Sequence, residues 1–202
     1  YADVIIAGGS EAAINPLPIA SFASMQALSR RNEDPATASR PYDVTRDGFV
    51  LGEGAAALVL ETYEHAIARG ARIYAEVLGG AVTSDAFHIT APDPEGSAAS
   101  RAMRQAVERS GHSLTDVVHV NAHATSTPVG DIAEYNALRR VFGDHLDDIV
   151  VAATKASTGH LLGGAGAIEA LFTVKALYER VVPPTINLTQ QDPEIPLDVA
   201  TS

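Results

Sequence analysis

Two histidines each follow a short apolar run that is typical of a buried strand. His123 comes just after residues 117–121, and His160 comes after residues 149–154. In α/β sheets, ligands collect outside the carboxyl ends of the strands. The pattern therefore predicts that the two imidazoles share one pocket. The alternative is a pair of unrelated core histidines whose hydrogen bonds are satisfied separately.

A helix is predicted to begin directly after His160 and to cover residues 161–182. The partial positive charge at a helix N-terminus disfavours imidazolium, so we expect His160 to be neutral near pH 7 and to donate a hydrogen bond. The small residues from Gly163 to Ala167 would let the backbone approach a ligand closely. Their spacing fits neither the P-loop nor the dinucleotide fingerprint, so phosphate binding is not expected there.

Glu169 interrupts this otherwise apolar helix. A carboxylate in apolar surroundings is costly unless it is paired. Lys155 stands at the end of the strand that leads into the helix, and it is the nearest cation with apolar neighbours. A buried Lys155–Glu169 pair is therefore predicted. The alternative is that Glu169 faces a subunit interface or a bound water.

Other kinds of chemistry are disfavoured. The chain has no cysteine, which excludes a thiol nucleophile or a thiolate zinc site within these 202 residues. No HExxH motif or carboxylate cluster at ligand spacing is present, so no metal site is predicted. The sequence contains no Gly-x-Ser-x-Gly motif, so a serine hydrolase of the α/β type is not indicated. The remaining histidines are interpreted as structural, with a loop-ordering role open for one of them, His88: His65, His88, His112, His119 and His145.

Strand and helix patterns alternate along the chain. Continuous apolar runs predict buried strands at residues 4–7, 55–60, 73–82, 117–121 and 149–154. Helical periodicity predicts helices at residues 16–28, 61–69, 97–110, 131–142 and 161–182. Gly8 and Gly9 are expected to form a tight turn after the first strand, and Gly79 and Gly80 to allow a bulge or a close backbone approach. The alternation indicates an α/β fold with a largely parallel sheet and a soft boundary near Gly70.

The composition is that of a globular protein. Hydrophobic residues make up 46% of the 202 residues and charged residues 19%, and the formal net charge is −11. This acidic balance argues against binding to nucleic acid or to an anionic membrane. No apolar run reaches the ~18 residues that a membrane-spanning helix needs. The chain opens on a strand without a signal peptide, and we expect it to be part of a longer protein.

Several segments resemble the β-ketoacyl-[acyl-carrier-protein] synthases of the condensing-enzyme II type. The two histidine motifs carry most of the resemblance, because their order and spacing are highly specific. The matching segments are residues 121–131 (NAHATSTPVGD), 155–169 (KASTGHLLGGAGAIE), 39–43 (SRPYD), 46–54 (RDGFVLGEG), 84–88 (SDAFH) and 182–187 (VPPTIN).

The resemblance implies a thiolase-like fold, in which two similar α/β halves stack as αβαβα layers. Residues 1–70 would be the end of the N-terminal half, and residues 71–202 most of the C-terminal half. A homodimer with a Cys-His-His active site is implied. No cofactor is implied, because the substrates themselves carry phosphopantetheine.

The resemblance also implies roles for individual residues. His123 and His160 match the two catalytic histidines, Lys155 the active-site lysine, and Glu169 the partner of that lysine. The positions that line the family's pantetheine tunnel are matched by Thr125 and Thr127.

The chain departs from the family pattern in four places. Ala124 stands where glycine is usual, and Ala156 stands where serine is usual. The nucleophilic Cys would lie upstream of Tyr1, and the glycine-rich segment that closes the second half would lie beyond Ser202. We therefore do not expect this chain alone to condense substrates.

The expected function of the full-length protein is decarboxylative condensation of an acyl thioester with malonyl-[acyl-carrier-protein] in fatty-acid elongation, in the cytoplasm. One alternative is the ketosynthase of a polyketide or long-chain lipid system, and another is a non-catalytic chain-length partner subunit. A degradative thiolase is disfavoured, because those enzymes use a second Cys in place of a His.

Carrier proteins are acidic, and the compact basic spot in the sequence is Arg30–Arg31, with Arg40 nearby. This spot is the predicted docking site, with solvated loop arginines as the alternative.

Overall fold

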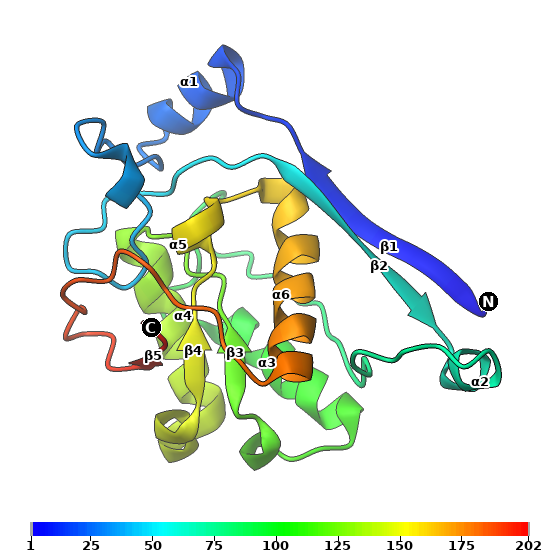
Figure 1. The fold of residues 1–202 in the computed structure, drawn as a ribbon. Helices are drawn as coiled ribbons and strands as arrows, with labels where there is room; N and C mark the ends of the chain where they lie inside the picture. Colours follow the sequence, from blue (N-terminus) through cyan, green and yellow to red (C-terminus); the bar gives the residue numbers. More distant parts are fainter. Residues whose placement is uncertain (1, 202) are drawn as a thin grey trace.

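The computed structural model describes residues 2–201, and these residues form two separate sheets (Figure 1). β1 (Val4–Glu11) and β2 (Gly54–Glu61) pair as a long antiparallel ribbon. A parallel sheet has the order β3–β4–β5, with bounds β3 (His119–Asn121), β4 (Val150–Ala152) and β5 (Asp198–Val199). The predicted α/β class is confirmed, and the parallel pairing is found in the second half of the chain.

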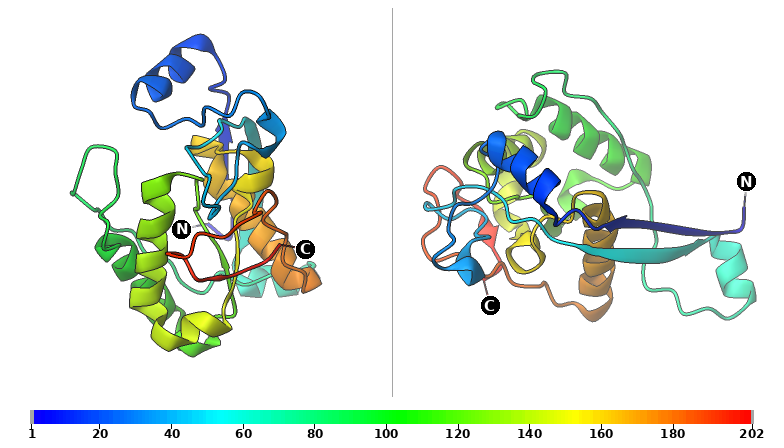
Figure 2. Two further views of the ribbon diagram at one scale, coloured as in Figure 1. Left: turned by 90° about the vertical axis from the view of Figure 1, so that its left-hand side faces the viewer. Right: turned by 90° about the horizontal axis from the view of Figure 1, so that it is seen from above.

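Helices and sheets alternate in layers. α6 (Ala165–Glu179) lies between the ribbon and the parallel sheet, while α3 (Ser97–Ser110) and α4 (Pro128–Phe142) pack together on the other side of that sheet (Figures 1 and 2). The shorter helices are α1 (Pro16–Ser24), α2 (Tyr63–Ala68) and α5 (Lys155–Thr158). Short 3-10 segments occur at Pro35–Thr37, Leu114–Asp116, Gly143–Asp148 and Leu162–Gly164.

The hydrophobic core lies between α4 and the parallel sheet. Leu138, Val141 and Phe142 of α4 belong to one buried cluster with Ile149 and Val151. Distant segments of the chain complete the cluster with Tyr42, Ile195 and Leu197. Burial of apolar area in this layer is the main force that fixes α4 against the strand ends.

The ribbon differs from the sequence prediction in two ways. Gly8 and Gly9 lie inside β1, not in a turn after it. A side chain at Gly9 would collide with the carbonyl of Gly163, so the glycine serves close packing. The strands are also not buried on both faces, since Ile6 is 74% exposed and Val59 is 63% exposed.

The strand predicted at residues 73–82 is wrong. This segment has no neighbouring strand among residues 2–201. Gly79 lies against α3, while Tyr74 packs against Tyr178 of α6 with ring centroids 5.0 Å apart. Arg109 donates a hydrogen bond to the carbonyl of Gly80 at 2.7 Å, and Thr83 donates one to Ala98 O at 2.8 Å. The predicted close approach at Gly79 is confirmed, because a side chain there would collide with Ala106 O.

The single helix predicted at residues 161–182 is also wrong. The backbone passes through α5, then a 3-10 turn in which Leu162 has φ +43°, and regular helix begins only at Ala165. α6 is less buried than its apolar sequence suggests, because only Ala165 and Ala176 are fully enclosed. Its remaining apolar side chains are half-buried or exposed beside the open ribbon.

The predicted boundaries of two other helices also shift. α1 ends at Ser24, four residues before the predicted end, and α4 begins at Pro128, three residues before the predicted start. The early start of α4 has a local cause. The Thr127 side chain accepts a hydrogen bond from Gly130 N at 3.2 Å, and Pro128 occupies the first turn.

A buried ionic network fastens the loop after α1 to α4 and to the C-terminal segment. Arg46 contacts Asp192 at 2.7 Å and Asp131 at 3.5 Å, and it donates a hydrogen bond to Pro128 O at 3.0 Å. Asp131 also accepts hydrogen bonds from the backbone N–H groups of Tyr42 and Ser126. Burial raises the pKa of Asp131 to about 7, while these hydrogen bonds and the charge of Arg46 act in the opposite direction. The network thus holds the start of α4, next to His123.

No helix within residues 2–201 combines the length and the apolar character that crossing a membrane requires.

We predict that Arg46→Ala destabilises the protein by about 3–5 kcal/mol, because it leaves Asp131 as a buried carboxylate without its cation. Urea denaturation followed by circular dichroism measures this loss. Asp131 would then protonate more readily, so the loss should shrink as the pH is lowered. Arg72→Ala, at an exposed cation, is the matched control. Equal effects of the two substitutions would contradict a supporting role for the network.

Candidate active site

The structure brings His123 and His160 together, as predicted. Their ring centroids lie 5.2 Å apart and the rings are nearly perpendicular, at 88°. His123 stands in the loop between β3 and α4, and His160 follows α5. The main chain of His160 is held by residues 50–52, because its N–H donates to Val50 O at 2.7 Å and its carbonyl accepts from Gly52 N at 3.0 Å. The shared location predicted from the two strand ends is therefore confirmed.

Both imidazoles have their Nδ1 atom engaged. The backbone N–H of Leu162 donates to Nδ1 of His160 at 3.2 Å. Nδ1 of His123 lies 3.4 Å from the ammonium of Lys155, which can only donate. In a neutral ring the proton must then reside on Nε2. Each histidine therefore has Nε2–H as the donor that remains for a ligand.

The surroundings keep both rings neutral. Desolvation, followed by the positive charges of Lys155 and His160, lowers the pKa of His123 to about 3. Desolvation and Lys155 lower the pKa of His160 to about 4. One side of His123 reaches solvent, whereas His160 is half-buried. Because solvent weakens desolvation at His123, we attribute the low pKa of this ring mainly to the adjacent ammonium of Lys155.

The prediction that His160 is neutral is thus supported, but the cause predicted for it is wrong. The regular helix starts at Ala165, so its N-terminus is not adjacent to the ring. The nearby backbone group that acts on His160 is the N–H of Leu162, and its effect is to select the tautomer. Burial and the charge of Lys155 keep the ring neutral.

The predicted Lys155–Glu169 pair is confirmed. The Lys155 ammonium and the Glu169 carboxylate form a direct ion pair, in which the lysine side chain is 2% exposed and the glutamate side chain 15%. Desolvation raises the pKa of Glu169, and the lysine opposes this shift. Ser39 fixes the start of α5 by donating to Lys155 O at 2.6 Å. The ammonium is therefore held beside the two rings.

Glu134 belongs to this site although the sequence analysis did not identify it. Its two carboxylate oxygens accept hydrogen bonds from the backbone N–H groups of His123 and Ala124, each at 2.7 Å. Ala124 has a φ of +26°, a conformation that is strained for a residue with a side chain. The carboxylate therefore holds the loop of His123 in place. The available signal was the spacing of Glu134 from Asp131, which puts a second carboxylate on the inner side of α4.

An aromatic contact at His160 was also not predicted. The ring of Phe49 lies against His160 with centroids 5.3 Å apart, and Phe22 of α1 lies 5.4 Å from Phe49. Both contacts are edge-to-face, which is a favoured geometry for aromatic pairs. Phe49 is 7% exposed, so it forms part of the wall that desolvates His160.

The two threonines predicted to line a tunnel, Thr125 and Thr127, lie two and four residues after His123. Their hydroxyl oxygens lie 3.0 Å apart, and Thr127 also caps α4. Between them, Ser126 has a φ of +69°, and its hydroxyl accepts from Arg40 N at 3.0 Å. Thr125 is nearly buried, at 9% exposed. The loop that carries the threonines is thus tied to other segments from several sides.

The predicted basic spot is smaller in space than in sequence. Arg30 is exposed, but Arg31 is half-buried and donates to the backbone and side chain of Thr45. Arg40 is buried and paired with Asp43 at 3.3 Å. A docking role for this loop remains a prediction that rests mainly on Arg30.

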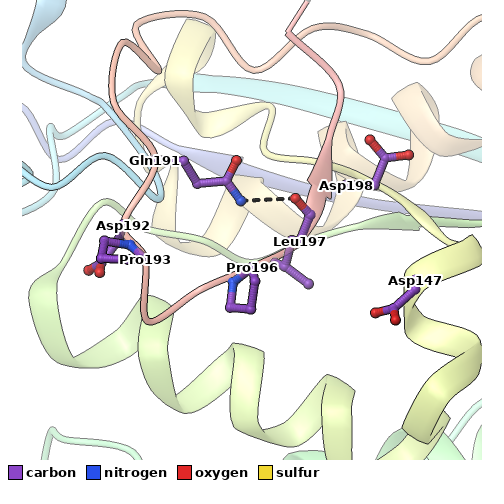
Figure 3. Close-up of a pocket in the computed structure, with 7 residues that line it drawn as sticks. All are labelled: Asp147, Gln191, Asp192, Pro193, Pro196, Leu197 and Asp198. Atoms are coloured by element: carbon purple, nitrogen blue, oxygen red, sulfur yellow. Dashed lines mark hydrogen bonds between the residues drawn. The ribbon is translucent and has the colours of Figure 1, made fainter.

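A hollow of about 510 Å³ lies apart from the histidines, beside the C-terminal segment (Figure 3). Its lining shares no residue with the histidine pair and consists of Asp147, Gln191, Asp192, Pro193, Pro196, Leu197 and Asp198. The side-chain amide of Gln191 donates hydrogen bonds to the carbonyls of Ile195 and Leu197. We interpret this hollow as a surface depression that results from the path of the C-terminal segment. Within residues 2–201, no group of three or more His, Asp and Glu side chains is arranged to hold a metal ion.

Comparison with known proteins gives consistent matches over the chain. The profile described as "Beta-ketoacyl synthase, C-terminal domain" matches residues 74–189, and that of the N-terminal domain matches residues 1–66. The chain is 55% identical to 3-oxoacyl-[acyl-carrier-protein] synthase 2 of Synechocystis over 198 residues, and 50% identical to that of Vibrio harveyi over 199 residues. Each match covers 98% of this chain and 48% of the relative, so the chain spans about half the length of these relatives.

Solved structures agree with these matches. A type II polyketide ketosynthase solved with its acyl-carrier protein has a TM-score of 0.96 at 40% identity, covering 99% of this chain and 49% of its own. A β-ketoacyl synthase from Burkholderia phymatum has a TM-score of 0.93 at 42% identity, covering 99% and 48%. The expected thiolase-like fold is thereby confirmed.

The two low pKa values lead to a prediction about protonation. In the folded protein both imidazoles should remain neutral at about pH 5, whereas in urea both should titrate near 6.5. Because the folded pKa values lie below the unfolded ones, the free energy of unfolding should fall as the pH drops from about 6.5 towards 4. Nuclear magnetic resonance of ¹⁵N-labelled histidine measures both the charge and the Nε2–H tautomer. Protonation of either ring near its ordinary pKa would contradict the prediction.

We predict that Glu134→Gln destabilises the protein by about 1–3 kcal/mol, because an amide oxygen cannot replace both carboxylate oxygens and one backbone N–H loses its acceptor. Urea denaturation measures the loss, and the amide resonances of His123 and Ala124 should move. Glu108→Gln, at an exposed position of α3, is the control and should do neither. Unchanged amide resonances at His123 and Ala124 would exclude the positioning role.

Proposed function

Because the chain belongs to the β-ketoacyl synthase family, we propose that the full-length protein condenses an acyl thioester with malonyl-[acyl-carrier-protein] in fatty-acid elongation. The family profiles and the synthase 2 relatives support this choice. The observation that carries it is the pair of adjacent neutral imidazoles, each with Nδ1 engaged and Nε2–H left to donate.

The chemistry of decarboxylation needs such a pair. When the bond between C2 and the malonyl carboxylate breaks, carbon dioxide leaves and the electron pair delocalises onto the thioester oxygen as an enolate. Two neutral N–H donors at that oxygen stabilise the developing charge and act as an oxyanion hole. C2 then attacks the acyl thioester carbonyl, a carbon–carbon bond forms, and the acyl group's sulfur leaves as thiolate. His123 and His160 are proposed as the two donors.

Lys155 and Glu169 are proposed to serve the same step. The buried ammonium disfavours a second positive charge nearby, so both imidazoles remain neutral donors. Glu169 holds the ammonium in place and offsets its desolvation. Thr125 and Thr127 are proposed to bind the pantetheine arm of the substrate, which is supported by their place in the loop that follows His123.

Other parts of the proposal rest on the family alone. The chain contains no cysteine, so the thiol that accepts the acyl group is proposed to come from outside these 202 residues. No separate cofactor is proposed, because the substrates carry phosphopantetheine. Acyl carrier protein is proposed as the partner, supported by the related ketosynthase solved with its acyl-carrier protein. A homodimer and a cytoplasmic location are proposed on the resemblance.

A polyketide ketosynthase is the second candidate. The observation in its favour is the TM-score of 0.96 to a type II polyketide ketosynthase. A non-catalytic chain-length subunit is a further candidate, and one chain of a ketosynthase/chain length factor structure matches with a TM-score of 0.90 at 36% identity. The retained histidine pair with its ammonium favours a catalytic subunit over that alternative.

The test is decarboxylation of malonyl-[acyl-carrier-protein] by the full-length protein. His123→Ala or His160→Ala should each lower the rate by about 10²–10³, as expected for losing one oxyanion-hole donor. His112→Ala, on an exposed histidine beyond α3, should leave the rate unchanged. Circular dichroism must show that the variants are folded. Full decarboxylation by both site variants would refute the proposed function.

A further inference from the structure

A half-buried carboxylate at the end of the ribbon has no cation as a partner. Glu11 is the last residue of β1 and lies opposite Gly54 of β2. Within residues 2–201, no lysine, arginine or histidine pairs with its side chain. Its two oxygens instead accept backbone N–H groups, from Ala12 at 3.1 Å and from Gly163 at 3.2 Å. The second contact spans 152 residues of sequence and joins the ribbon to the turn that follows His160.

That turn, Leu162–Gly164, sets the tautomer of His160. The N–H of Leu162 donates to Nδ1 of the imidazole at 3.2 Å, which leaves the ring proton on Nε2. Leu162 has a φ of +43°, which is strained for a residue with a side chain. Such a conformation persists only where the surrounding structure holds it. The N–H that Glu11 accepts belongs to the next residue, so the carboxylate acts beside the strained position.

The end of the ribbon and the turn fit together without space for further side chains, beside the start of α6 (Figure 1). A Cβ atom added at Gly163 would lie 3.2 Å from Ser10 O, and one added at Gly164 would lie 3.1 Å from Gly54 O. Leu161, which is 2% exposed, lies against Gly54. A displacement of this end of the ribbon is therefore transmitted to the turn.

We propose that Glu11 is a positioning residue for His160, an inference that rests on the proposed function. Its carboxylate fixes the direction of the Gly163 N–H, and through the adjoining peptide group it fixes the direction of the Leu162 N–H on the imidazole. Gly163 is exposed, so water could satisfy its N–H without Glu11. Water would not fix the orientation of the turn, and the Nε2–H of His160 would lose its aim at the substrate oxygen.

The loop of the other histidine is held in a similar way. Glu134 accepts the backbone N–H groups of His123 and Ala124, and Ala124 has a φ of +26°. In both places a carboxylate binds backbone N–H groups at or next to a residue with a strained, positive φ. The two carboxylates come from different elements, α4 and β1, so the ribbon contributes to the site as well as the helical layer does.

The experiment compares Glu11→Ala with Glu61→Ala in the full-length protein. Glu61 lies at the other end of the ribbon, where Arg69 and His65 bind it, so its loss perturbs the ribbon without touching the turn. Glu11→Ala should lower the kcat of malonyl decarboxylation about tenfold or more, because the donor is misplaced. The KM should change little, because the lost contact is not one that binds substrate. Glu61→Ala should leave the kcat unchanged.

Nuclear magnetic resonance of ¹⁵N-labelled histidine gives a readout that a merely structural role would not move. In the folded Glu11→Ala variant, part of the His160 population should carry its proton on Nδ1, because the Leu162 N–H no longer occupies that atom. His123 should keep its Nε2–H, because Lys155 still contacts its Nδ1. The same spectra of Glu61→Ala should match those of the unsubstituted protein.

Glu11→Gln is the conservative variant and should recover most of the kcat. A single amide oxygen can accept from Gly163, and solvent can replace the contact to the exposed Ala12. An unchanged kcat or an unchanged His160 tautomer in folded Glu11→Ala would overturn the positioning role, and so would an equal loss of kcat in Glu61→Ala. Failure of the proposed function would appear instead as no decarboxylation by the unsubstituted protein, and the His160 tautomer would then decide the role of Glu11 alone.

Discussion

A buried ammonium group beside two imidazoles is the constraint on which the site depends. Lys155 is 1% exposed, and its charge would be too costly to bury without Glu169. Once paired, it adds to the desolvation that lowers the pKa of both rings, and it occupies Nδ1 of His123. The tautomer of His123 and, together with desolvation, the neutral charge of both histidines therefore depend on where this one side chain is held.

Much of the remaining structure serves to hold loops that have no regular structure of their own. The loop of His123 is fixed by Glu134 and Asp131 from α4, and by Arg40 and Gly48 from the segment after α1. His160 is held by the main chain of residues 50–52 and by the ring of Phe49. Polar contacts over long sequence separations thus replace the helix or sheet that could have supported these residues.

The sequence predicts the reactive residues of the site better than the residues that hold them in place. His123 and His160 are predictable because each follows an apolar strand, and the Lys155–Glu169 pair is predictable because one carboxylate interrupts an apolar stretch of helix. The roles of Glu134 and Phe49 are not predictable in this way, because they come from contacts with the loop of His123 and with the ring of His160 that only the folded chain brings together. The segment at residues 73–82 has a strand's composition but packs against α3 and α6, and the apolar run at 161–182 hides a break at Leu162, where φ is positive.

The long ribbon also bears on the order of folding. Residues 119–152 form β3, α4 and β4 from neighbouring stretches of chain, whereas β1 must find β2 across the whole of residues 12–53. Closing a longer loop costs more entropy, and structures rich in distant contacts fold more slowly. The same long segment supplies the contacts to His160 and to the loop of His123. We therefore expect the α4 layer to assemble early and the histidine pair to reach its final geometry late, so that a correctly placed pair reports on complete folding.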